Sequence, residues 1–246
     1  MGNISAKRIL IALMVVTVVI LTIAGGFWVY MNYFTRKNGG PGTKIVNASD
    51  IPDRESCVFS MPGDPSRESK PLEELLPSGW KRMNRRIVVD KSSRTLNVYT
   101  GKRRVKSYFI ALGYRPEGPK AKRDDGKTPE GVYYVCSRNP RSNYELSLLI
   151  AYPGKAEADN GLKNGLIDKA VYSSITSALS EKRTPPQDTA LGSYICIHGG
   201  GIGELASDFS KARINDWTQG CIAMRSEDIE EVYDFADPGT TVEIRP

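Results

Sequence analysis

The sequence has little histidine and little cysteine, and this limits the metal sites that it can build. Its 246 residues include one histidine, His198, and four cysteines, which are Cys57, Cys136, Cys196 and Cys221. No two cysteines have the C-x-x-C spacing of a zinc site, and their positions do not suggest a disulfide framework. Cys196 and His198 form a C-x-H pair on one face of an expected strand, but no second pair completes a tetrahedral site. We therefore expect no metal ion and interpret Cys196 as a small buried residue.

The sequence also lacks the features of a nucleic-acid-binding protein. It contains no basic stripe with interleaved aromatic residues and no recognisable reader motif. A formal net charge of +6 and a pI of about 9.1 nevertheless favour anionic partners, such as wall polymers or acidic lipid head groups. The hydrophobic content of 40% is that of a globular chain, long enough for one domain with a core.

Charge is absent from Ile9–Phe34, and this run predicts a membrane anchor. As a helix, about 26 residues would span about 39 Å, enough to cross a bilayer with some tilt. Aromatic rings favour the water interface, and four gather at the end of the run: Trp28, Tyr30, Tyr33 and Phe34. Residues 1–8 are then expected in the cytoplasm. A cleaved signal peptide is the alternative, but the apolar run is long and no clear small-x-small site follows it.

Residues 35–79 are rich in glycine, proline, serine and charge, a composition that predicts a spacer. A short helix is expected at Leu72–Leu76, because Pro77 would stop it. A flexible spacer of about 45 residues would let the domain that follows, residues 80–246, reach several nanometres from the membrane.

Short strands dominate residues 80–246. Apolar or alternating runs predict strands at 87–89, 96–98, 105–112, 132–136, 148–152, 194–197, 222–224 and 242–244. Two helices are expected among them, one within about Leu166–Glu181 and one at Glu227–Phe235, the second with Ser226 as its N-cap. The predicted fold is mostly β with two or three helices, behind an N-terminal transmembrane helix.

The histidine and one cysteine lie at the ends of two apolar segments. His198 ends the run Ile195–His198 and precedes three glycines, and Gly220 and Cys221 open the run Ile222–Met224. A thiol needs a nearby imidazole to be mainly thiolate at neutral pH, and His198 is the only imidazole in the chain. Gly220 would let a substrate backbone approach, and nearby amides would bind an oxyanion. The pattern alone equally allows a hydrogen-bonded strand-end histidine and a small buried cysteine.

Several segments together resemble the catalytic domain of L,D-transpeptidases, the YkuD domain. Residues 195–201 (Ile-Cys-Ile-His-Gly-Gly-Gly) and 216–224 (Asp-Trp-Thr-Gln-Gly-Cys-Ile-Ala-Met) are similar to the family's signature. Residues 87–99 resemble its opening hairpin, and residues 126–133 its Thr-Pro-x-Gly turn. The resemblance covers residues 86–246, and the combination of motifs is specific where each alone is not. It implies a YkuD-like mixed β-sandwich and makes residues 80–246 the catalytic domain.

The resemblance implies a role for each matching residue. Cys221 matches the family's nucleophile and His198 its base, whose ring is oriented by the carbonyl of the next residue, Gly199. The expected supporting and oxyanion-binding positions are Gly199, Thr218, Gln219 and Gly220.

Two departures from the family pattern bear on donor recognition. The usual histidine two positions before the cysteine is Gln219 here, and the usual arginine two positions after it is Ala223. Arg225 lies on the same face of an expected strand as residue 223 and could supply the missing guanidinium, although a solvated surface charge is the alternative. Arg225 and Trp217 are the expected substrate-binding residues.

The resemblance implies acyl transfer on peptidoglycan stem peptides through a thioester on Cys221, with no metal or organic cofactor. The acceptor stays open between an amine of another stem, a lysine of a wall-attached protein, and water. A hydrolase of the same scaffold and a catalytically weak wall-binding module are the alternatives. The domain is expected to be anchored to the bacterial cytoplasmic membrane by one helix and to face the periplasm or extracytoplasmic space, without nucleic acid as a partner. In that oxidising compartment Cys57, Cys136 and Cys196 could pair among themselves, but not with Cys221 if it is to act.

Overall fold

A computed structural model describes residues 58–60, 70–203 and 213–246. These residues belong to a unit that runs from Asp53 to Pro246. The expected anchor Ile9–Phe34 and most of the expected spacer lie outside the described residues. Within the described ranges, no helix is both long and apolar enough to cross a membrane.

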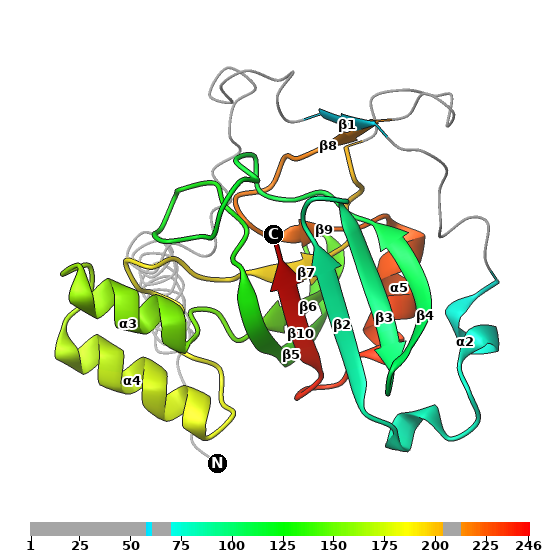
Figure 1. The fold of residues 1–246 in the computed structure, drawn as a ribbon, viewed down its shortest axis with the longest axis horizontal. Helices are drawn as coiled ribbons and strands as arrows, with labels where there is room; N and C mark the ends of the chain where they lie inside the picture. Colours follow the sequence, from blue (N-terminus) through cyan, green and yellow to red (C-terminus); the bar gives the residue numbers. More distant parts are fainter. Residues whose placement is uncertain (1–57, 61–69, 204–212) are drawn as a thin grey trace, which may run out of the picture. The chain divides into compact units, whose positions relative to one another are not determined.

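Eight strands form one sheet in the order β4-β3-β2-β10-β5-β6-β7-β9 (Figure 1). Their bounds are β2 Arg85–Asp90, β3 Thr95–Thr100, β4 Arg103–Phe109, β5 Gly131–Ser142, β6 Glu145–Ile150, β7 Cys196–His198, β9 Ile222–Ala223 and β10 Thr241–Arg245. A separate antiparallel pair joins β1, Val58–Ser60, to β8, Arg213–Asn215. Strand β1 lies within the range that the sequence predicts to be spacer.

The hairpin of β2 and β3 forms where the sequence predicts it. Ile87 pairs with Val98 and Val89 pairs with Leu96, and all four side chains are fully buried. The turn between the strands is closed by the carboxylate of Asp90, which accepts hydrogen bonds from the side chain of Ser92 and the amide of Ser93. Asp and Ser side chains commonly bond to nearby backbone in this way, which favours turns over regular structure.

The sheet curls at β5, because the two ends of this strand pair with different neighbours. The first part of β5 pairs with β10, where Tyr134 lies opposite Thr241, and the later part pairs with β6 from Val135 onwards, with a shift in register between Val135 and Ser137. Beyond the end of β4, Ala111 exchanges two backbone hydrogen bonds of 2.9 Å with Ala223 of β9. The first and last strands of the sheet are thereby joined. The predicted mostly β fold is confirmed, in the form of a curled sheet.

In the part of the chain that the structure describes, three helices of more than two turns accompany the sheet: α3 Lys155–Lys163, α4 Lys169–Ser180 and α5 Ser226–Phe235. Shorter elements precede β2, namely α2 Leu72–Leu75 and the 3-10 turn η1 Trp80–Arg82. Helices α3 and α4 lie side by side (Figure 1) around a small apolar core of Ala158, Ile167, Ile175 and Leu191. The sequence predicts α4, but it does not predict α3.

Capping explains where these helices begin. The side chain of Asp168 accepts a hydrogen bond from the amide of Val171 at 2.8 Å, so α4 starts at Lys169, within the predicted range. The expected N-cap at Ser226 is wrong, because Ser226 is the first residue of α5 and follows the N-cap Arg225. The hydroxyl of Ser226 instead donates to Glu145 at 2.8 Å.

Candidate active site

The parallel pairing of β7 and β9 brings the two halves of the predicted site together. Ile197 lies opposite Ile222 and His198 opposite Ala223, and the amide of Met224 donates to the carbonyl of His198 at 2.8 Å. Cys221 immediately precedes β9, so its thiol lies beside the imidazole of His198, close enough for each group to shift the pKa of the other. Two segments that are far apart in the sequence thus present a thiol and an imidazole to each other.

The ring of His198 is held by a backbone carbonyl. Its Nδ1 lies 2.6 Å from the carbonyl oxygen of Gly199, and the side chain is 3% exposed. Because a carbonyl only accepts, Nδ1 carries the proton and the other ring nitrogen, Nε2, is the atom left for the thiol. This is the contact that the family pattern predicts for positions 198 and 199.

Two aromatic side chains fix the plane of the imidazole. The ring of Tyr144 stacks on it at 4.5 Å between centroids with an interplanar angle of 25°, and Trp217 approaches its edge at 5.9 Å and 70°. Trp217 is itself held by a hydrogen bond from its indole to the carbonyl of Gly201 at 3.2 Å. Trp217 was expected to bind substrate, whereas its ring here contacts the histidine. Tyr144 comes from the turn between β5 and β6, and no motif in the sequence singles it out.

The thiol and the imidazole shift each other's proton affinity. The pKa of Cys221 lies well below its ordinary value of 9.0, because its sulfur accepts hydrogen bonds from Cys196 and from His198 and faces the imidazole charge, while burial opposes the shift. Burial also disfavours a charged His198, but the bond to Cys221, its negative charge and the carbonyl of Gly199 outweigh this and raise the pKa of His198 above 6.5. Both shifts favour a thiolate–imidazolium pair over a neutral thiol and a neutral imidazole.

The hydroxyl of Thr218 organises the turn before the nucleophile candidate. It donates to the carbonyl of Cys221 at 2.7 Å and accepts from the amide of Gly220 at 3.1 Å. The amide of Gly220 is therefore already engaged by the protein. Of the two amides expected to hold an oxyanion, that of Cys221 is the better candidate.

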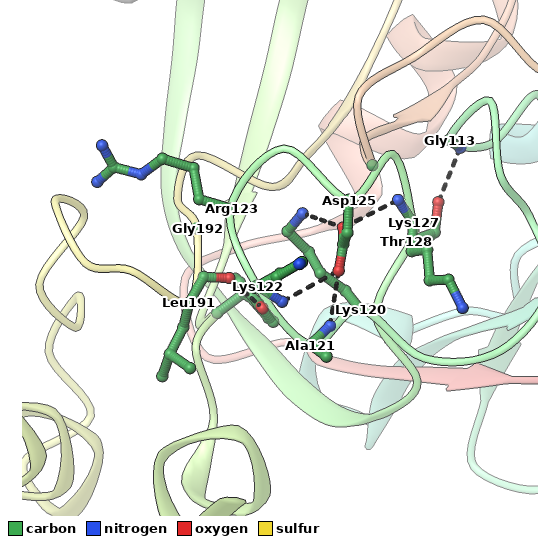
Figure 2. Close-up of polar contacts among 12 residues, drawn as sticks. Gly113, Lys120, Ala121, Lys122, Arg123, Asp125, Lys127, Thr128, Leu191 and Gly192 are labelled. Atoms are coloured by element: carbon green, nitrogen blue, oxygen red, sulfur yellow. Dashed lines mark hydrogen bonds and ion pairs between the residues drawn. The ribbon is translucent and has the colours of Figure 1, made fainter. Parts of the chain in front are cut away.

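The loop between β4 and β5 packs against this turn. Figure 2 shows how the buried carboxylate of Asp125 orders the loop by accepting four hydrogen bonds from it. The donors are the ammonium of Lys120 at 2.7 Å and the amides of Ala121 at 2.8 Å, Lys122 at 3.0 Å and Lys127 at 3.1 Å. The hydroxyl of Thr128, in the predicted Thr-Pro-x-Gly turn, accepts from the amide of Gly113 at 2.9 Å (Figure 2).

Gly220 is required by this loop. Its φ of +132° lies in the region that favours glycine, and a Cβ there would overlap the carbonyl oxygen of Lys127. The sequence predicts that Gly220 gives room to the substrate backbone, but the backbone that approaches it in the structure is the protein's own.

Replacing Gly220 with alanine is therefore expected to destabilise the fold by about 2–4 kcal/mol, through backbone strain and overlap with Lys127. Urea-induced unfolding measures this free energy. Gly239→Ala is the matched control, since Gly239 also has a positive φ of +92° but no atom within 4 Å of its Cβ position. A loss of stability no larger than that of Gly239→Ala would show that the loop moves to accommodate the added Cβ at little cost in free energy.

A buried ion pair anchors the start of the second signature segment. Asp216 is 0% exposed and accepts from Arg94 at 2.7 Å and from the amide of Leu112 at 2.7 Å. Burial raises the pKa of Asp216 above its ordinary value, although its bonds to Arg94 and Leu112 oppose the shift. Since a buried carboxylate is tolerated only when it is paired, this contact fixes the chain where β8 ends and the segment with Trp217 begins.

The structure changes the interpretation of the positions that depart from the family pattern. Arg225 is 5% exposed and lies 3.7 Å from the carboxylate of Asp228, so the alternative of a solvated surface charge is wrong. Ala223 is fully buried in an apolar cluster with Phe109, Ala111, Ile202 and Ile214, which accounts for a small residue there. Gln219 is half-buried beside Gly220.

Cys196, which the sequence pattern favours as a small buried residue, is a neighbour of the site. Its backbone amide lies 3.5 Å from the sulfur of Cys221, and its thiol is close enough to lower the pKa of Cys221. The carbonyl of Tyr194 accepts from the Cys221 thiol at 3.4 Å. Cys196 lies two residues before His198 on the same strand. This spacing is the sequence signal that could have placed Cys196 near the site. Among the described residues, no group of three or more His, Cys, Asp or Glu side chains is placed to hold a metal ion.

Comparison with known proteins identifies a family. The family model described as the L,D-transpeptidase catalytic domain, YkuD, matches residues 84–244. No curated protein matches the sequence.

Among solved structures, the chain is similar to Bd1075 of Bdellovibrio bacteriovorus, with a TM-score of 0.41, 21% identity, and coverage of 72% of this chain and 53% of that one. It is similar to the helical cell shape determining protein Pgp2 of Campylobacter jejuni, with a TM-score of 0.43, 20% identity, and coverage of 71% and 53%. An L,D-transpeptidase from Mycobacterium smegmatis has a TM-score of 0.38, 12% identity, and coverage of 67% and 59%. The chain thus spans between half and two thirds of the length of these proteins.

Proposed function

The chain belongs to the L,D-transpeptidase catalytic domain family, and from this premise we propose that it is a cysteine acyltransferase acting on peptidoglycan stem peptides. Cys221 is the nucleophile and His198 the base. The observation that carries the proposal is that the pairing of β7 with β9 brings these two side chains together, with Nδ1 of His198 held on the carbonyl of Gly199. A base whose second nitrogen is fixed in this way keeps the orientation and tautomer that proton transfer requires.

The reaction begins with the Cys221 thiolate, whose proton resides on Nε2 of His198. The sulfur attacks the carbonyl that links the L-centre of a diamino acid to a terminal D-amino acid in the stem. The tetrahedral intermediate collapses to a thioester, and His198 returns the proton to the amine of the departing D-amino acid. An acceptor then attacks the thioester carbonyl, again with proton transfer to His198, and restores the Cys221 thiolate.

The developing oxyanion needs a donor near the sulfur, and the amide of Cys221 is proposed for it. The support is that Thr218 already engages the amide of Gly220 and ties down the carbonyl of Cys221, which fixes the peptide planes of this turn. Preorganised donors of this kind cost no reorganisation during the reaction. Gly199 positions the imidazole of His198, and Thr218 positions the backbone of Gly220 and Cys221. Gln219 is proposed as a supporting residue of this turn. Arg225 and Trp217 are proposed to lie near the donor peptide.

We place the catalytic domain outside the cytoplasmic membrane, tethered by a single helix at Ile9–Phe34 and a spacer at residues 35–79. The support is the uncharged apolar run and the cell-wall chemistry of the family. Residues 80–246 are the catalytic domain in this proposal. Its partners are stem peptides, the membrane and, as one acceptor, a lysine of a wall-attached protein.

The nature of the acceptor is tested by the product masses of the full-length chain acting on a tetrapeptide muropeptide, with and without an added stem amine. Transpeptidation predicts a crosslinked product that grows with the amine concentration. A product that is only the tripeptide, at a rate independent of the amine, would instead establish a hydrolase of the same scaffold. Turnover in neither arm would leave a wall-binding module and contradict the proposal.

Tyr144→Ala is expected to lower kcat by about ten-fold, because the imidazole would lose the ring that stacks on it at 4.5 Å. Tyr144→Phe preserves the stacked ring and is expected to keep kcat within about two-fold. Steady-state turnover of the muropeptide measures both. Equal losses in the two variants would show that the tyrosine hydroxyl matters instead, and no loss in either would show that the stack does not position His198.

A further inference from the structure

Cys196 and Cys221 occupy facing positions on adjacent strands. Strands β7 and β9 are parallel with Ile197 opposite Ile222, so one step back along each strand sets Cys196 beside Cys221. Neighbouring strands lie about 4.8 Å apart. Disulfide-bonded cysteines have Cα atoms about 4.4–6.8 Å apart, so the backbone spacing suits a bridge.

The two side chains also point to the same place. The sulfur of Cys221 lies 3.5 Å from the backbone amide of Cys196, and the Cys196 side chain is close enough to lower the pKa of Cys221. Both side chains are partly exposed, so a small reagent in solution has access to the pair. A partly exposed thiolate with a second thiol as its neighbour is the arrangement in which thiol–disulfide exchange proceeds to an internal bridge.

Cys136 is the other described cysteine, and it is poorly placed to compete. It lies on β5, and β6 runs between β5 and β7, where Leu149 pairs with both Ser137 and Cys196. Two strand spacings amount to about 9.6 Å, beyond the limit of about 7 Å for a disulfide without backbone movement. Burial raises the pKa of Cys136 to about 11, which keeps it a thiol near neutral pH. No disulfide joins any of the described cysteines in the structure.

We propose that Cys196 and Cys221 form a modification site, at which a low-molecular-weight disulfide converts the two thiols into a reversible bridge that blocks the nucleophile. The Cys221 thiolate attacks one sulfur of the reagent, forming a mixed disulfide and releasing one reagent thiolate, which takes the proton held on Nε2 of His198 and leaves the imidazole neutral. The Cys196 thiol then gives up its proton to His198, and its sulfur attacks the sulfur of Cys221. A second reagent thiolate leaves and takes up that proton, so two protein thiols are oxidised while one reagent disulfide is reduced to two thiols.

Oxidised glutathione is the probe, applied to the full-length chain carrying Cys57→Ser and Cys136→Ser, in which Cys196 and Cys221 are the cysteines that remain. Intact mass after an acid quench is expected to show the loss of two hydrogen atoms, with no glutathione retained and full reversal by dithiothreitol. Adding Cys196→Ser removes the second thiol, and the chain should then retain one glutathione on Cys221. Stable retention of glutathione while Cys196 is present would overturn the proposal.

If the doubly substituted chain does not fold, the unsubstituted chain is oxidised and digested without reduction. A crosslinked peptide pair containing Cys196 and Cys221 supports the site, and a bridge from either residue to Cys57 or Cys136 overturns it. Loss of turnover on oxidation and its recovery with dithiothreitol form a separate readout that rests on the proposed function. A chain that forms the bridge but shows no turnover when reduced would contradict the proposed function and leave the modification site standing.

Discussion

Replacing Cys221 with alanine is expected to reduce muropeptide turnover by about 10⁴-fold or more, to the background rate, because it removes the sulfur that forms the thioester in the proposed mechanism. The fold should survive, since the side chain is only partly buried and alanine fills most of its volume. Stopped assays on the full-length chain measure the rate, and thermal unfolding measures the stability.

Cys221→Ser and Cys136→Ser are the controls for this substitution. Serine preserves the size and hydrogen bonding of the thiol but is a far weaker nucleophile near neutral pH, so its activity should resemble that of the alanine variant. Cys136 lies on β5 outside the site, and its replacement should leave turnover unchanged. Turnover in Cys221→Ala within ten-fold of that of the unsubstituted chain would mean that the chemistry lies elsewhere.

Replacing His198 with glutamine is expected to lower kcat by about 10²–10⁴-fold, which is the usual contribution of a general base to the rate. It should also change how the thiol titrates. The imidazole contributes to the lowered pKa of Cys221, so the thiolate persists below pH 9.0 in the unsubstituted chain and alkylation by iodoacetamide remains fast near pH 6. Without the imidazole the midpoint of the alkylation profile moves up toward 9.0, and the rate at pH 6 falls about ten-fold or more.

The two directions of the pKa shifts define the pH window of this pair. The lowered pKa of Cys221 means that the thiolate forms as the pH rises through a value below 9.0, and the raised pKa of His198 means that the imidazolium survives above 6.5. Cys196→Ser separates the effect of Cys196 on the pKa of Cys221 from that of His198, because it changes the first residue and leaves the second in place. An alkylation profile that does not change in His198→Gln would contradict the pairing, and with it the assignment of His198 as the base.

The strands of the sheet could be predicted from sequence because each follows a short-range rule. Ile87 to Val89 and Leu96 to Val98 show the apolar pattern of buried strands, and the turn residues between them are typical of hairpins. Helix α3 was missed because Asn160 and Gly161 are poor helix formers, and its stability comes from packing. Gly161 lies against Leu191, and Glu157 accepts from the amide of Gly154 at 2.8 Å. Neither contact shows in the local pattern.

The sequence predicts those parts of the candidate site that belong to a family motif and also lie at the end of an apolar segment. His198 and Cys221 follow from the family signature, and their juxtaposition follows from two strands that the structure places side by side. The stack of Tyr144 on His198 depends on how a hairpin tip folds over β7, which no local rule gives. The same holds for the loop carbonyl of Lys127 that requires Gly220, and for Cys196, whose partner becomes evident only once the register of β7 and β9 is known.

Intact mass spectrometry of the full-length chain, quenched during reaction with a tetrapeptide muropeptide, tests the central assignment most directly. The unsubstituted chain should gain the mass of the donor less its terminal D-amino acid, with the adduct on Cys221. The same adduct should be absent from Cys221→Ala, and in His198→Gln it should accumulate slowly. An adduct on any other residue, or turnover with no adduct under conditions that slow the second step, would contradict a thioester on Cys221.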